Sequence, residues 1–501
     1  DNRKGLVQGS GSVEMTVGHF ENGQGGVESA QAIALRADRV ENQQGRIVAT
    51  GKLGITAQAM DNQDGLAVAA GVLAVDVASM GNRGGRLGAG TTLVVKTAGQ
   101  LENQGGEIAS NGAMSLTAAG VGNDAGVISA GGQLEAKLAD GVLDGGSGKL
   151  LAGGPMNIRA SELRLAGGTV ASNDVLTLDV TKLDADGGTL QAEKALTLKM
   201  EALTAKGGAA IQTGGDLVAD VQTMALSAGG KLLANGNADV KVADLALSGG
   251  QIVAAGKLKL ATPNLTAGAG SMLGAGGQLE ITTQALDNAG TLSAGGDMQL
   301  SASHTTNSGK MLAGGKLGLV TERFDNLGGA VAANQRVEIA LSGDLRNSGR
   351  IESQQGLDVV ARAIDNTGGT LNANGQIKLV TDDIVNRNGV LATGGNFVFN
   401  GTRFDNTGGS LVAEGNIDMA AQQFSTVGGL MSAGGKLAVK VDGTLDNRQG
   451  KLLASSDLQL NGAGSINNTG GVLSAGNTIV FGSTLRDLVN TGGVVSTNGS
   501  L

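Results

Sequence analysis

The chain has 501 residues, of which 88 are Gly, only 7 are Phe and 2 are Pro, and it contains no Trp, Tyr or Cys. So few aromatic side chains argue against a spherical core, because aromatic residues normally supply its largest blocks of buried area. The absence of Cys excludes disulfides and thiolate metal sites. With a formal charge of −9 and scattered basic residues, nucleic acid is not an expected partner.

A repeat of about 20 residues begins at the first residues. Within residues 1–143 an Asn recurs every 20 or 21 positions, usually with Gly two to four residues later, and such fixed periods are typical of stacked repeat proteins. Between successive Asn residues the apolar side chains occupy alternate positions, as along a β-strand with one buried face. The Asn series of this segment consists of Asn2, Asn22, Asn42, Asn62, Asn82, Asn103 and Asn123.

Residues 144–285 keep the alternating strand pattern but lose the corner Asn, as at 183–188 and 203–208. The two prolines, Pro155 and Pro263, also fall in this segment. The pattern predicts that the coils continue with a changed corner. Either a bulge or altered face of the protein, or simple drift of the repeat, would account for the change.

Residues 286–501 return to Asn at intervals of 19 to 22 positions, with one position skipped between Asn406 and Asn447. Equivalent apolar residues follow each Asn at equal distances, and we predict that they stack as core columns. We expect the corner Asn side chains to form a ladder of amides. The column residues are Leu371, Leu391 and Leu411 in one column and Phe404 and Phe424 in another; the ladder residues are Asn22, Asn42, Asn62, Asn326, Asn366, Asn386 and Asn406.

Two short strands per period and corners rich in Gly and Asn indicate one coil of a β-solenoid, in which each strand pairs in parallel with its copy one period later. We therefore predict an all-β, right-handed parallel β-helix of about 25 coils. At ~4.8 Å per coil it would be a rod on the order of 120 Å long. We expect three regions of one continuous rod, 1–143, 144–285 and 286–501, with no independent globular domain.

Candidate catalytic groups do not come together in this arrangement. His19 and His304 are separated by roughly 14 coils, so that they cannot share a proton or a metal ion. Asp382 and Asp383 are adjacent on one strand and face opposite sides, and the Gly-rich run 145–150 lacks the spacing of a phosphate-binding loop. We predict no catalytic, cofactor-binding or metal-binding residues, and a polysaccharide-cleaving enzyme is the weakest alternative.

The outward residues of the strands form flat faces that are candidates for binding. Lys378, Val398 and Asp418 share one offset in successive coils. Such a face can bind a receptor on a target cell by shape and hydrogen bonding. Nothing in the sequence distinguishes it from an ordinary solvated surface, so a spacer and a receptor-binding module both stay open.

The corner and strand formula D-N-x-G-G-x-L-x-A-x-G-x-[LI]-x-[LMF] recurs nearly from end to end, most clearly at 286–290, 324–329 and 404–409. It resembles the haemagglutinin repeats of two-partner-secretion exoproteins, which include filamentous-haemagglutinin adhesins and the shafts of contact-dependent growth-inhibition proteins. The resemblance covers almost the whole chain. It does not distinguish an adhesin from a growth-inhibition parent.

This resemblance implies a non-catalytic shaft without cofactors, secreted or displayed at the outer membrane of a Gram-negative bacterium. It also implies an outer-membrane two-partner-secretion transporter as a partner, and adhesive or toxin-bearing elements elsewhere in the parent. No run approaches the ~18 apolar residues of a membrane-spanning helix. Both ends fall within the repeat pattern, and we expect the chain to be part of a longer array.

Overall fold

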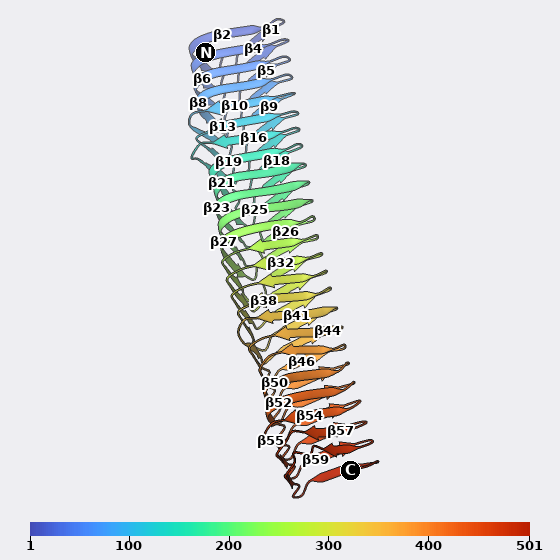
Figure 1. Ribbon diagram of the computed structural model, residues 1–501. Helices are drawn as coiled ribbons and strands as arrows, with labels where there is room; N and C mark the ends of the chain where they lie inside the picture. The colour runs from blue at the N-terminus through green and yellow to red at the C-terminus, as the bar shows by residue number, and fades with distance from the viewer. The chain divides into compact units, whose positions relative to one another are not determined.

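The computed structural model describes residues 1–501, and every regular element in it is a β-strand. The strands form a parallel β-solenoid of about 25 coils, each coil about 20 residues long. The prediction of an all-β parallel solenoid is confirmed. The chain divides into two compact units, Asp1–Gly256 and Lys257–Leu501, and within each unit the strands of successive coils stack on one another (Figure 1).

In the first unit a coil begins with a short strand, such as β3 (Gly26–Ser29), and continues in a longer one, such as β4 (Ile33–Glu41). β4 pairs with β6 (Leu53–Asp61) in two stretches that are interrupted after Arg36. These coils therefore have the two strands that were predicted, and the pairing of the longer strand is interrupted at a bend. The stretch after the bend presents one inward residue, Val40 in this coil, which is too brief an alternation to be recognised as a strand of its own.

Further along the first unit the same coil takes two other forms. In some coils the long strand separates into two, as in β10 (Leu93–Thr97) and β11 (Gln100–Glu102). In the Asn-free segment the long strand becomes continuous through the corner and reaches 12 residues. These long strands pair in parallel, and two isolated bridges beside them, Ala166 with Gly187 and Ser227 with Gly249, are antiparallel. The 12-residue strands are β21 (Val175–Asp186), β23 (Ala195–Lys206) and β25 (Asp216–Ser227).

In most coils of the second unit the long strand is divided into two, so that the coil has three strands where two were predicted. A representative coil consists of β46 (Thr370–Ala373), β47 (Ile377–Val380) and β48 (Asp383–Val385). β46 pairs with β49 (Val390–Thr393), and β49 pairs in turn with β51 (Ser410–Ala413). Parallel pairing without a shift in register places identical positions of successive coils on one another.

The core consists of columns of small and medium apolar side chains. Leu371 pairs with Leu391 and Leu391 with Leu411, and all three are fully buried. The ring of Phe404 stacks on that of Phe424 with centroids 5.9 Å apart. Such columns provide dispersion contacts in every layer of a narrow interior without needing large aromatic clusters.

Leu391→Asp tests the assigned register. The change places a carboxylate inside a column where no donor is available, and it also removes a buried leucine, so we expect a loss of at least about 3 kcal/mol in unfolding free energy. The matched control is Val390→Asp, one residue earlier on the outward side of the same strand, which should change stability by less than about 1 kcal/mol. Thermal unfolding followed by circular dichroism measures both; equal stability of the two variants would contradict the register.

Candidate functional site

Buried Asn side chains form a ladder at one corner of the first unit. Asn22 Nδ2 donates to Asn42 Oδ1 at 2.7 Å, and Asn42 Nδ2 donates to Asn62 Oδ1 at the same distance. The Asn22 amide also donates to the backbone carbonyl oxygens of Gly25 and Arg46. All the amide dipoles therefore point the same way along the stack, an arrangement in which hydrogen bonds polarise one another.

The second unit contains the same ladder. Asn326 Nδ2 donates to Asn347 Oδ1, and Asn366 donates through Asn386 to Asn406, with nitrogen–oxygen distances of 2.7 Å. The structure thus places all seven ladder residues singled out in the sequence on these two stacks. Their role is to satisfy buried backbone carbonyls at the corner, because an unpaired carbonyl there would be costly.

The turn after each Asn is shaped by the ladder. In the corner that begins at Asn406, Gly408 has a φ of +65°, a conformation that glycine adopts without strain. A side chain at the next residue, Gly409, would place its Cβ 2.0 Å from the backbone oxygen of Asn386 and 2.7 Å from Asn406 Oδ1. The Asn and the Gly three positions later are therefore required together.

The Asn-free segment replaces the ladder by an apolar column. The residues that occupy the corner position are Gly145, Leu165, Ala185, Ala205, Leu226 and Leu247 in the first unit and Ala267 in the second, and all of them are buried. The segment therefore keeps its corner closed by packing instead of by side-chain hydrogen bonds.

At two positions the Asn ladder starts again after a coil without a corner Asn, and the first Asn of the new run receives no hydrogen bond from the preceding coil. Asn288 follows Ala267, and Asn447 follows Thr426, whose hydroxyl accepts from Asn406 Nδ2 at 3.4 Å. The Oδ1 atoms of Asn288 and Asn447 are buried and accept no hydrogen bond. An unsatisfied buried acceptor lowers stability, so each resumption of the ladder is a weak point.

Thr426→Asn should repair one of these points. Gly428 and Gly429 already provide the turn that an Asn needs, and a new amide could accept from Asn406 and donate to Asn447 Oδ1. We expect a gain of about 1 kcal/mol in unfolding free energy. Thr426→Val is the control, because it removes the hydroxyl and should lower stability. Urea titration of the three proteins measures the effect, and an unchanged or lower stability of Thr426→Asn would disprove this account of the ladder.

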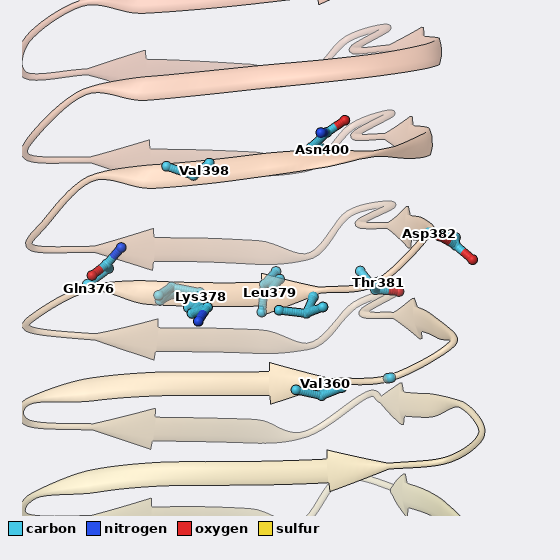
Figure 2. A pocket seen from close by; sticks show the side chains of 11 residues that line it. Val360, Gln376, Lys378, Leu379, Thr381, Asp382, Val398 and Asn400 are labelled. Carbon is cyan, nitrogen blue, oxygen red and sulfur yellow. The ribbon is translucent and has the colours of Figure 1, made fainter.

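An outward face of the second unit carries a shallow pocket of about 590 Å³ (Figure 2). Three neighbouring strands line it, and Val360, Val380 and Val398 on them are each about half exposed. Lys378 pairs in register with Val398, and Val398 with Asp418, so these three residues lie in one outward column. The pocket combines exposed aliphatic surface with the ammonium group of Lys378 and the carboxylate of Asp382.

The outward face of the Asn-free segment has a different chemistry. Its residues alternate in sign along one column, and Arg159 Nε lies 3.0 Å from Asp179 Oδ2. This alternation neutralises the face internally, so it offers neither a basic nor an acidic patch to a polymer. The column consists of Arg159, Asp179, Lys199, Asp220 and Lys241.

Beside this column, Glu162 is the centre of a three-residue ion-pair cluster. Arg164 Nη2 lies 2.6 Å and Lys182 Nζ 2.8 Å from its carboxylate. Hydrogen bonds from these two cations lower the pKa of Glu162 from its ordinary 4.5 to about 2. The folded protein therefore gains stability from this carboxylate above pH 4.5 and loses the gain as the pH falls towards 2.

Glu162→Gln should reveal this dependence. The variant should be less stable than the parent by about 1 kcal/mol at pH 7, since the cations are half exposed and solvent screens them. The difference should vanish between pH 4.5 and 2. Glu193→Gln, an exposed site without an ion pair, is the control. Thermal unfolding over this pH range measures the effect; a difference independent of pH would contradict it.

His19 lies next to two carboxylates, a grouping that the sequence analysis missed. Its ring lies 3.6 Å from Glu21 Oε1 and 3.4 Å from Glu41 Oε1. His304 is remote from His19, so no second histidine is available to it, but carboxylates of neighbouring positions are. The signal was present in the repeat, because positions 19 and 21 share one side of a strand and position 41 is one period beyond 21.

Comparison with protein families decides the class of the chain. The family model of the haemagglutinin repeat matches nine overlapping stretches that together span residues 8–501: 8–105, 103–139, 136–187, 175–232, 221–270, 253–349, 327–401, 380–449 and 432–501. The chain belongs to the haemagglutinin repeat family. No curated protein and no solved structure matches it.

Haemagglutinin repeats are typically structural or adhesive parts of proteins that bacteria secrete or display, and they are typically not enzymes. The family also implies a two-partner-secretion context. Among the secondary-structure elements no helix is long and apolar enough to span a membrane. A haemagglutinin repeat array in a parallel solenoid fits an adhesin-like shaft.

Proposed function

We propose that this chain is the non-catalytic shaft of a bacterial exoprotein, which holds adhesive or toxin-bearing elements of its parent at a distance from the cell. The observation that supports this proposal best is the regular succession of parallel coils matched by one repeat family over residues 8–501. In such an array each coil contacts its neighbours, and length is gained simply by adding coils. The first unit alone has 13 short strands, one per coil, which at ~4.8 Å per coil extend over about 60 Å.

The mechanism that we propose is cooperative stacking during secretion. A folded coil exposes the hydrogen-bonding edge of its strands, and the next coil to emerge from an outer-membrane transporter pairs with that edge. Corner amides such as Asn42 then bond to the coil before and the coil after. Folding that propagates coil by coil suits a chain that arrives in order, and the absence of Cys prevents premature cross-links on the way.

A second function, binding to a target cell, is favoured by the pocket of Figure 2. Lys378 makes no ion pair there, and it lies among the half-exposed Val360, Val380 and Val398. Aliphatic surface around an unpaired cation fits a protein partner that presents an acidic side chain beside apolar ones. This partner would be a receptor on the surface of the target cell.

Cell binding distinguishes the two functions. The purified 501-residue chain, labelled and added to neighbouring bacteria and to animal epithelial cells, should show no saturable binding if it is a shaft. If the chain binds saturably and Val380→Asp weakens that binding at least tenfold, the chain is a binding module and not only a shaft. Val218→Asp is the matched control, since Val218 is an equally exposed valine on a strand of the first unit, and it should leave any specific binding unchanged.

A further inference from the structure

The grouping of His19, Glu21 and Glu41 follows from the backbone pairing. His19 and Glu21 lie at the end of β2 (Val13–Glu21), two positions apart and therefore on the same side of the strand. Glu21 pairs in register with Glu41 at the end of β4. The three side chains are partly exposed, from 26% to 45%. The solenoid thus holds one imidazole and two carboxylates together at an accessible corner.

Each of the two carboxylates lies within ligand distance of one nitrogen of the His19 ring. Zn²⁺ binds His nitrogen and carboxylate oxygen at about 2.0–2.2 Å, and two ligands of a tetrahedron with such bonds are about 3.3–3.6 Å apart. His19 Nδ1 lies 3.6 Å from Glu21 Oε1, and His19 Nε2 lies 3.4 Å from Glu41 Oε1. One ligand atom from each of the three residues falls within 4.8 Å of the others. Because the two short distances belong to different ring nitrogens, binding of one ion through a single nitrogen requires the partly exposed side chains to rotate.

We propose that His19, Glu21 and Glu41 form a binding site for one divalent transition-metal ion, with Zn²⁺ as the probe. The imidazole nitrogen favours Zn²⁺ and its transition-metal neighbours over Ca²⁺ and Mg²⁺, which take oxygen ligands. Three protein ligands leave a fourth position that faces solvent. Water, or a side chain of another molecule, can complete the coordination, so the corner is a point where metal can join this chain to a partner.

Two arginines form ion pairs with the two carboxylates of the site. Arg3 Nε lies 3.1 Å from Glu21 Oε2, the oxygen that does not face the imidazole, and so orients Glu21 without occupying its ligand atom. Arg39 Nε lies 2.6 Å from Glu41 Oε1, which is the oxygen nearest His19. Metal binding therefore requires Arg39 to move to the other oxygen or into solvent. Arg39→Gln removes this competitor and should tighten metal binding, the opposite of the effect of losing a ligand.

The test uses isothermal titration of the full chain with Zn²⁺ and the absorption spectrum of bound Co²⁺, which reports tetrahedral coordination. His304→Ala is the matched control, because the chain has only two His residues and His304 lies between Ala285 and Arg323 in its column. We expect one ion bound by the parent chain and by His304→Ala, at least tenfold weaker binding by His19→Ala and Glu41→Gln, and tighter binding by Arg39→Gln. Circular dichroism checks that each variant is folded.

Two results would overturn the proposal. One is the absence of any saturable Zn²⁺ binding by the parent chain, which would leave the grouping as a network of surface ion pairs. The other is equal binding by His19→Ala and His304→Ala, which would place the ion elsewhere. Neither result touches the proposed shaft function, since the stacking of coils does not depend on these side chains.

Discussion

The parallel hydrogen bonding of each strand to its copy one coil later is the constraint on which the rest of the structure depends. It fixes a spacing of ~4.8 Å between coils and places equivalent residues on one another. Leu371 therefore meets Leu391, and Asn22 meets Asn42. Every position becomes part of a column, so a substitution is judged by what lies directly above and below it in its own unit.

Because corner residues of successive coils lie in one column, a change of residue type at one corner affects its neighbours. In a run of Asn each amide donates to the next. In the apolar run that contains Ala185 and Ala205 the corner residues are buried against one another and leave no side-chain hydrogen bond unmade. Stability is lost where a run of Asn begins after another kind of corner. Asn288 follows the apolar Ala267 and Asn447 follows the single Thr426, and in both Asn residues the buried side-chain oxygen lacks a donor.

The sequence predicts those features that repeat in every coil, and it does not reveal those that depend on contacts between two particular coils. Period and alternation were enough to predict the parallel solenoid, because they repeat in almost every coil. The bend in the longer strand, and its division into two strands in other coils, were missed because the stretch after the bend has one inward residue per coil, such as Val40. The neighbours of His19 were missed because they are a property of two coils taken together. The unsatisfied oxygen of Asn447 depends on Thr426 in the preceding coil, so it too is invisible in a single repeat.

Only the outward positions of the coils are available for a binding site. Inward and corner residues are committed to packing and to the ladder, as Leu391 and Asn366 are. Outward residues are free to differ from coil to coil, and they do: the same outward offset carries Lys378, Val398 and Asp418 in successive coils. Any binding function must therefore be assembled from outward residues of adjacent coils, at the 4.8 Å spacing that the backbone sets. That spacing places charged groups of adjacent coils within reach of one another, as it does for Arg159 and Asp179 and for His19 and Glu41.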